Sequence, residues 1–205
     1  KRPFRAPHHT ITMSALVGGG RKAKPGEISL ATHGVLFLDE LPEFSRDVIE
    51  VLRQPLEERK VYVDRVASSA VYPANFMLVA AMNPCKCGFY PDRKKCTCSE
   101  NQVRQYRGKL SQPLLDRIDI CIELSVVPYS EWFSGNIYES SGSIRERVVK
   151  AREIQTERYL HENFNTNALI PASKIETYCP LGKNEQAIMM HAFQGMELSG
   201  RGYHR

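Results

Sequence analysis

The run of four apolar residues at 35–38 constrains the fold more than any other part of the sequence, because it leads directly into the acids Asp39 and Glu40. A continuous apolar run is typical of a strand that is buried on both faces of a parallel sheet. In open α/β sheets, ligands bind beyond the carboxyl ends of such strands. The sequence therefore predicts an α/β fold with both carboxylates at the ligand-binding edge.

Two interpretations of the acid pair are open from this segment alone. In a nucleoside triphosphatase, the first carboxylate holds Mg²⁺ and the second polarises the attacking water. Alternatively, the strand simply ends in two solvated acids, which is a common pattern. The rest of the chain is needed to choose between them.

Composition sets broad limits on the class of protein. The chain has 205 residues, an apolar fraction of 42% and a formal net charge of +5, which suits one large or two small globular domains. It has no apolar run of transmembrane length, and its basic start at 1–5 does not lead into a secretory signal. We therefore expect a cytoplasmic protein without a membrane segment. The charge permits contact with nucleic acid but does not by itself predict it.

Periodicity and turn residues divide the first part of the chain. Residues 1–34 are rich in Gly, Pro, His and Lys and predict an irregular or hairpin-like segment. A helix is expected after Pro42, with Ser45 as its N-cap, and residues 60–66 and 70–72 alternate as a β-hairpin. Further elements are expected as a second buried strand at 76–81, a helix at 111–116 and a third strand at 118–124.

The second part of the chain has a helical pattern. We expect a charged helix at 144–161, shorter helices at 172–178 and 184–196, and another helix that begins at Ser199. The sequence thus predicts a partial α/β core at 1–128 and an α-helical domain at 129–205. Because the last helix has hardly begun at residue 205, we expect a fragment of a longer protein.

The order of these elements, together with four segments, resembles one family. The segments are PGEISLA at 25–31, GVLFLDELPEF at 34–44, AAMNPC at 80–85 and PLLDRIDI at 113–120. They resemble the magnesium-chelatase-like proteins of the ComM/YifB family. The resemblance implies a partial AAA+ P-loop NTPase core, a parallel sheet with an inserted β-hairpin, followed by an α-helical lid. Chelatase ATPase subunits and minichromosome-maintenance helicases are more distantly similar.

The resemblance assigns roles to three residues at the sheet edge. Asp39 and Glu40 match the Walker B pair, with Asp39 on Mg²⁺ and Glu40 on the catalytic water of ATP hydrolysis. Asn83 matches the sensor 1 position, where an amide contacts the γ-phosphate or the attacking water. Alternatively, Asn83 only turns the chain before Pro84.

Arginines are matched in the same way. Arg117 matches the arginine finger that one subunit supplies to its neighbour's ATP, although Asp116 and Asp119 would allow a local ion pair instead. Arg201 resembles the sensor 2 arginine that contacts the nucleotide, with Arg205 as its rival.

The sequence lacks a phosphate-binding loop, which needs a Gly-rich turn followed by Lys and then Ser or Thr. In the segment GGGRKA at 18–23, Ala follows the Lys and no strand is expected before the glycines. In the family, the loop lies upstream of the residue that matches Lys1. We therefore expect ATP hydrolysis by the intact protein and little or no nucleotide binding by this fragment.

Four of the six cysteines fall in an expected insertion at about 83–102. They are Cys85, Cys87, Cys96 and Cys98. Such clustering without export signals favours a metal site or reduced thiols over disulfides. Four thiolates fill the tetrahedral shell of a structural Zn²⁺, and the spacer between the two pairs is long enough to bring them together. Free thiols are the alternative. Cys121 and Cys179 are expected to be ordinary buried thiols.

The expected hairpin occupies the place of the pore hairpin in related ring helicases. Arg65 near its tip and Lys60 at its base are therefore candidates for DNA contact. The alternative is that both side chains are only solvated.

The resemblance as a whole implies an ATP-driven motor that forms a homo-oligomer, a hexameric ring, and acts on DNA in branch migration. One alternative is a chelatase-type motor that drives metal insertion through a partner subunit. A second alternative, from another class, is a non-catalytic interaction module that carries zinc. DNA-stimulated ATPase activity would favour the helicase, and a full-length protein without the phosphate-binding loop would favour the interaction module.

Overall fold

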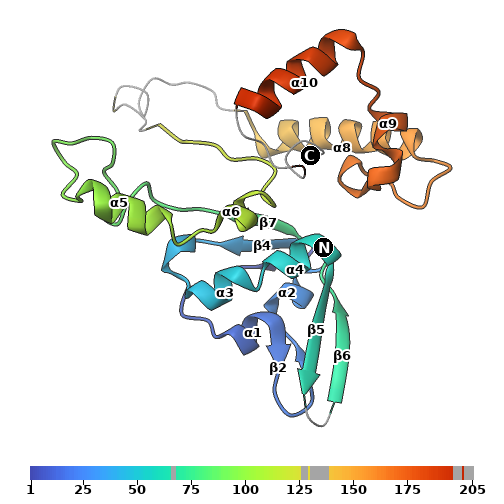
Figure 1. The fold of residues 1–205 in the computed structure, drawn as a ribbon. Helices are drawn as coiled ribbons and strands as arrows, with labels where there is room; N and C mark the ends of the chain where they lie inside the picture. The colour runs from blue at the N-terminus through green and yellow to red at the C-terminus, as the bar shows by residue number, and fades with distance from the viewer. Residues whose placement is uncertain (66–67, 126–128, 130–138, 196–199, 201–205) are drawn as a thin grey trace. The chain divides into compact units, whose positions relative to one another are not determined.

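The computed structural model describes the chain except residues 66–67, 126–128, 130–138, 196–199 and 201–205. The chain divides into two compact units, Lys1–Ile120 and Cys121–Arg205. The first is mixed α/β and the second is helical (Figure 1), which confirms the predicted fold class. The interpretation of the units as a core and its lid, with a boundary near residue 128, remains a prediction.

A parallel sheet of three strands forms the centre of the first unit. Its order is β1 (Phe4–Arg5), β4 (Val35–Leu38) and β7 (Met77–Ala80). The side chains of β4 alternate between half-buried and buried, so the expected burial on both faces is wrong. The second expected strand is present as β7, but its expected burial is wrong too, because only Leu78 is partly buried. Leu36 and Leu38 are fully buried in the main core, whereas Phe37 on the opposite face is only partly covered and stacks on the exposed Phe4.

Short elements precede β4, where the sequence predicted an irregular or hairpin-like segment. They are α1 (Met13–Val17), β2 (Gly18–Gly19), β3 (Lys24–Pro25) and α2 (Glu27–Leu30). The antiparallel β2–β3 pair confirms the hairpin. Strand β1 and helices α1 and α2 were not predicted, because elements of two to five residues are too short to show a period.

Helices and a hairpin follow β4. They are the 3₁₀ turn η1 (Leu41–Glu43), the helices α3 (Arg46–Glu50) and α4 (Arg53–Glu58), and the hairpin strands β5 (Lys60–Arg65) and β6 (Ser68–Pro73). Val48 and Leu52 are buried as predicted. Val61 and Val63 anchor the hairpin in the same core, so both the helical segment and the hairpin are confirmed.

Two helices complete the first unit, namely α5 (Glu100–Arg107) and α6 (Gln112–Leu115). Helix α6 was predicted, but α5 was not, although Ser99 and Gln102 form a capping box at its start. The expected third strand at 118–124 is wrong, because the structure describes these residues without any strand pairing. Ile120 and Ile122 are exposed, and an alternating apolar pattern forms a strand only where a partner strand lies beside it.

The second unit is built around one long helix, α8 (Ser141–Arg158), with Ser140 as its N-cap. It also contains η2 (Asn167–Leu169), η3 (Ala172–Lys174), α9 (Ile175–Tyr178) and α10 (Lys183–Gly195). Tyr159, Phe164 and Tyr178 pack as an aromatic cluster. The predicted helices are confirmed, and the one expected from Ser199 lies outside the described residues. Of the helices in the described part of the chain, none has the length and apolarity to span a membrane.

Gly34 permits the close pairing of β1 with β4. A Cβ atom at this position would lie 1.9 Å from the Pro3 carbonyl oxygen, which accepts a hydrogen bond from the Val35 N–H at 2.9 Å. We expect Gly34→Ala to lower the free energy of unfolding by about 1–3 kcal/mol in chemical denaturation, because backbone must move to admit the methyl group. Gly195→Ala is the control, since, apart from its own helix and its chain neighbours, no described atom lies within 4 Å of its Cβ position. Equal stability of the two variants would contradict this packing.

Candidate functional site

The acid pair and Asn83 lie at the same edge of the central sheet. Strands β4 and β7 are parallel, with Leu38 opposite Ala80. Their hydrogen bonding continues past the strand ends, because Ala81 N–H donates to the Leu38 carbonyl (3.0 Å) and Leu41 N–H donates to the Ala81 carbonyl (2.9 Å). Asp39 and Glu40 therefore leave β4 next to the segment that carries Asn83, and all three residues are exposed.

The backbone at Glu40 adopts an uncommon conformation. Its φ is +52°, in the left-handed region that non-glycine residues rarely occupy. The Asp39 carboxylate accepts a hydrogen bond from Glu40 N–H at 2.9 Å, and the Glu40 carbonyl accepts one from Glu43 N–H at 2.7 Å. These contacts hold a tight turn directly after β4. Residues kept in sparsely populated conformations often belong to functional sites.

His9 lies against the acid pair, a contact that the sequence analysis missed. Its Nδ1 is 3.4 Å from Glu40 Oε2, and its ring packs edge-on against Phe44 with the ring centroids 6.3 Å apart. The pairing of β1 with β4 explains the contact, because the chain that leaves the parallel strand β1 runs along the same edge of the sheet. A separation of 31 residues offers no local sequence signal for it.

Arg117 forms an ion pair within the first unit. Its side chain is only 9% exposed, and Nη2 lies 2.6 Å from the Glu57 carboxylate at the end of α4. Nη1 donates to the Pro113 carbonyl, and Nε is buried without an acceptor. The neighbouring Asp116 accepts a hydrogen bond from Gln112 instead. Arg117 therefore forms an ion pair, although with Glu57 and not with Asp116, and its role as an arginine finger remains a prediction.

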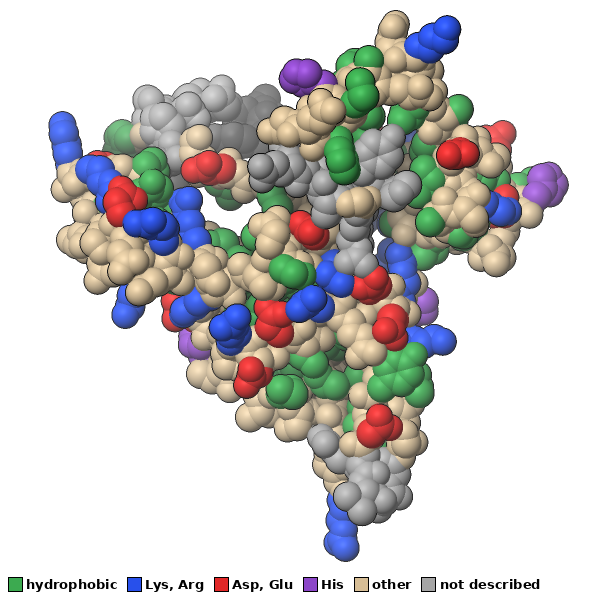
Figure 2. All heavy atoms as spheres, in the orientation of Figure 1, with side chains coloured by type: hydrophobic (Ala, Val, Ile, Leu, Met, Phe, Trp, Pro, Cys, Tyr) green, Lys and Arg blue, Asp and Glu red, His purple; other side chains and the backbone are tan. Residues whose placement is uncertain are grey.

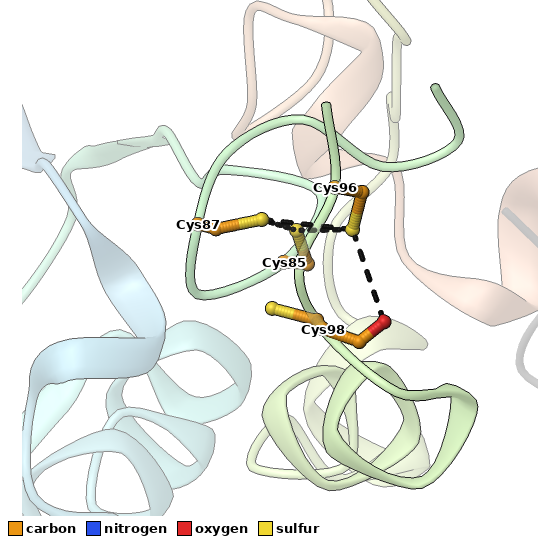
Figure 3. A group of neighbouring side chains, drawn as sticks. All are labelled: Cys85, Cys87, Cys96 and Cys98. Atoms are coloured by element: carbon orange, nitrogen blue, oxygen red, sulfur yellow. Dashed lines mark hydrogen bonds between the residues drawn. The ribbon is translucent and has the colours of Figure 1, made fainter. Parts of the chain in front are cut away.

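The four clustered cysteines converge on one point (Figure 3). The Sγ atoms of Cys85 and Cys87 are 3.4 Å apart, and Cys96 Sγ lies 3.8 and 3.5 Å from them. With Cys98 included, all four sulfurs lie within 4.8 Å of one another. Sequence positions up to 13 residues apart are thus brought together, as a metal site requires.

The chemistry of these thiols suits a soft divalent metal. A hydrogen bond from the Phe89 backbone is the largest cause that lowers the pKa of Cys87 to about 5, which favours the thiolate form that binds metals. Burial is the largest cause that raises the pKa of Cys96 to about 11. Zn²⁺ prefers thiolate donors in a tetrahedral set, and the converging sulfurs fit that preference.

The other predicted site residues are only partly described. Lys60 is exposed at the base of the hairpin, where its backbone pairs with Pro73. Arg65 pairs with Ser68 at the last described position of β5, and Arg201 and Arg205 lie outside the described residues. The expectation that Cys121 and Cys179 are buried is wrong, because both are exposed. Neither residue belongs to an element with a buried face. The apolar character of a cysteine was therefore not sufficient to predict its burial.

Comparisons with known proteins connect this architecture to one class. A family model described as "Magnesium chelatase, subunit ChlI" matches residues 1–132, and a second, described as its C-terminal part, matches residues 138–205. The "Magnesium-chelatase subunit ChlI homolog" of Methanocaldococcus jannaschii is 23% identical over 163 residues, which cover 71% of this chain and 39% of the homolog. The chain is thus a magnesium-chelatase-like protein.

Two other relatives are more similar. Competence protein ComM of Haemophilus influenzae is 47% identical over 206 residues, and YifB of Escherichia coli is 39% identical over 206 residues. Each alignment covers the whole of this chain but only 40% of the relative. The chain belongs to the ComM/YifB family and spans about two fifths of the length of these relatives.

The Arg117–Glu57 pair makes a testable contribution to stability. Glu57→Gln removes the charged partner of the buried Arg117 guanidinium, so we expect the free energy of unfolding to fall by about 1–2 kcal/mol. This is less than for a fully buried ion pair, because Glu57 is half-exposed. Glu58→Gln is the matched control on the same helix and should change stability by less than about 0.5 kcal/mol. Chemical denaturation of both variants measures the difference. If Glu57→Gln cost no more than the control, Arg117 would not depend on this partner.

Proposed function

We propose that the protein is an AAA+ ATPase of the ComM type, whose ATP-driven motor acts on DNA in branch migration in the cytoplasm. The observation that carries the proposal is the edge shared by β4 and β7, where the acid pair and Asn83 follow adjacent parallel strands. Ligands of open α/β sheets bind at this edge. The 47% sequence identity to ComM, in an alignment that covers the whole of this chain, supports the same assignment.

The residues at the edge suit Mg²⁺ and ATP. Asp39 and Glu40 present exposed carboxylates, and carboxylate oxygens are ligands that Mg²⁺ prefers. In the proposed roles Asp39 holds Mg²⁺, Glu40 accepts a proton from the attacking water, and Asn83 binds the γ-phosphate or that water. Mg²⁺ held by Asp39 would neutralise charge on the phosphates. His9 restrains the Glu40 carboxylate through its contact with Oε2.

No segment of the 205 residues has the Gly-rich pattern followed by Lys and Ser or Thr that a phosphate-binding loop needs, so the proposed ATPase site is not complete in this chain alone. Backbone amides and the lysine of that loop hold the phosphates in P-loop NTPases. We therefore propose that the chain by itself does not hydrolyse ATP and that the full-length protein does. Arg201 is the proposed sensor 2 residue.

DNA is the proposed substrate of the motor. Lys60 and Arg65 mark the base and tip of the β5–β6 hairpin, and basic side chains on such an element can contact phosphates without reading sequence. Figure 2 shows further Lys and Arg side chains (blue) gathered over the part of the first unit that holds α5 and the cysteine segment. A homo-oligomeric ring, proposed to be a hexamer, would place the hairpins around a common pore.

A chelatase-type motor is the second candidate, since both matching family models are described by the magnesium chelatase subunit. Such a motor would act through a partner subunit and would not need DNA. Measurement of ATP turnover by full-length protein with and without DNA separates the two. Stimulation by DNA supports the helicase, and its absence supports the chelatase-type motor.

Glu40→Gln in full-length protein tests the acid pair. The amide keeps the shape of the side chain but cannot accept the proton, so turnover should fall on the order of a hundredfold or more. ATP binding should stay close to that of the wild type, as measured by titration with a fluorescent nucleotide. Near-normal hydrolysis would remove Glu40 from the catalytic site.

Arg117→Ala tests whether the arginine acts across a subunit interface. The variant alone should hydrolyse ATP slowly. A mixture with Glu40→Gln subunits should regain activity, because some interfaces then combine an intact Glu40 with an intact Arg117. Mixed assembly must be verified separately, for example with two affinity tags. If verified mixed rings showed no recovery, the ion pair with Glu57 would be the main role of Arg117.

A further inference from the structure

We propose that Cys85, Cys87, Cys96 and Cys98 bind one structural Zn²⁺, and that this metal site holds Asn83 in place beside the acid pair. The first statement stands on the sulfur geometry alone. The second rests on the proposed function, because it concerns the position of a residue of the ATPase site.

Three of the four sulfurs, those of Cys85, Cys87 and Cys96, are spaced nearly as they would be around a tetrahedral ion, and Cys98 Sγ lies within 4.8 Å of them. Four sulfurs at about 2.3 Å from Zn²⁺ are about 3.8 Å from one another, and three of the sulfur pairs here measure 3.4, 3.8 and 3.5 Å. A disulfide would need a separation of about 2.05 Å, and all four thiols are free. The arrangement is therefore that of one shared ligand set and not of two bonded pairs.

The segment around the thiols has little apolar burial to order it. Of residues 81–99, all of which the structure describes, Cys85 alone is buried. Phe89 is half-exposed, and the basic residues of the segment are on the surface. Fixing a backbone costs about 1–2 kcal/mol per residue, so a segment without an apolar core needs another source of stability. A bound Zn²⁺ supplies it directly.

The first ligand lies very near the proposed ATPase site. Cys85 is two residues after Asn83, and the intervening Pro84 carbonyl accepts a hydrogen bond from Arg107 Nε at 3.0 Å. Arg107 also lies over the ring of Tyr90, 4.8 Å from its centroid. These contacts with α5 thus restrain the chain that directly follows Asn83.

The last ligand leads back to the acid pair. Cys98 directly precedes Ser99, the N-cap of α5. Beyond α5, Leu110 enters the main core with Leu41, and Lys109 Nζ donates to the Pro42 carbonyl at 2.6 Å. Leu41 and Pro42 immediately follow Glu40.

The first ligand, Cys85, closely follows Asn83, and the last ligand, Cys98, leads into helix α5. A metal bound by both would therefore join the chain after Asn83 to α5, which is anchored next to Glu40. Loss of the metal should release this connection while the sheet remains folded. Asn83 would then lose its fixed position, and a displacement of about 1 Å in a catalytic group can cost about a hundredfold in rate.

The test uses full-length protein with Cys87→Ser and, separately, Cys96→Ser. Cys121→Ser and Cys179→Ser are matched controls, because these cysteines are exposed and outside the cluster. Elemental analysis of reduced wild-type protein and of both controls should find about one Zn²⁺ per chain, and the two cluster variants should have lost it. Amide hydrogen exchange should quicken in residues 83–102 of the cluster variants but not in β4.

ATP turnover provides the second measurement. We expect the cluster variants to hydrolyse ATP roughly ten- to a hundredfold more slowly, with nucleotide affinity changed by less than about threefold. Treatment of wild-type protein with a zinc chelator should reproduce the faster exchange, and added Zn²⁺ should reverse it. Because this experiment uses wild-type protein, it remains valid if a cysteine variant fails to fold.

Wild-type protein without zinc and with slow exchange in residues 83–102 would overturn the metal site. Loss of zinc without faster exchange around Asn83 would overturn its proposed role in holding that residue, as would unchanged turnover. Zinc content and amide exchange need no ATPase activity. They therefore test the metal site even if the full-length protein proves not to be an ATPase, an outcome that would contradict the proposed function alone.

Discussion

The parallel pairing of β4 with β7 is the interaction on which the candidate site depends. Its register places Leu38 opposite Ala80, and two further hydrogen bonds extend it to Ala81 and Leu41. A shift by one residue would turn the side chains of the strand to the opposite face. Leu36 and Leu38, which are fully buried, oppose such a shift. The same apolar contacts that stabilise the sheet therefore also set where Asp39, Glu40 and Asn83 leave it.

Much of this arrangement could be predicted from local patterns. Strand β4 was predicted from its continuous apolar run, and the helical segment after Ser45 and the β5–β6 hairpin from periods of 3.6 and 2 residues. All three are confirmed. The strand expected at 118–124 has the right alternation but no partner strand, and pairing cannot be read from one segment. Helix α5 shows how a mostly polar element can be missed. Its signals are the capping box of Ser99 and Gln102 and only two buried side chains, Val103 and Tyr106.

Contacts between distant residues were the least predictable part of the site. Arg117 and Glu57 are 60 residues apart in sequence, and Asp116 and Asp119 are nearer candidates for the same ion pair. His9 reaches Glu40 only because a strand of two residues, β1, joins the sheet next to β4. The cysteine cluster was predictable from composition, whereas its connection through α5 to both sides of the sheet edge needed the structure.

We propose above all that the edge formed by Asp39, Glu40 and Asn83 binds the phosphates of ATP with Mg²⁺. The most direct measurement is an experimental structure of the full-length Glu40→Gln protein with ATP and Mg²⁺. We expect Mg²⁺ within reach of the Asp39 carboxylate, directly or through water, and the γ-phosphate or its water within hydrogen-bonding distance of Asn83. Nucleotide bound away from the carboxyl ends of β4 and β7 would contradict the claim.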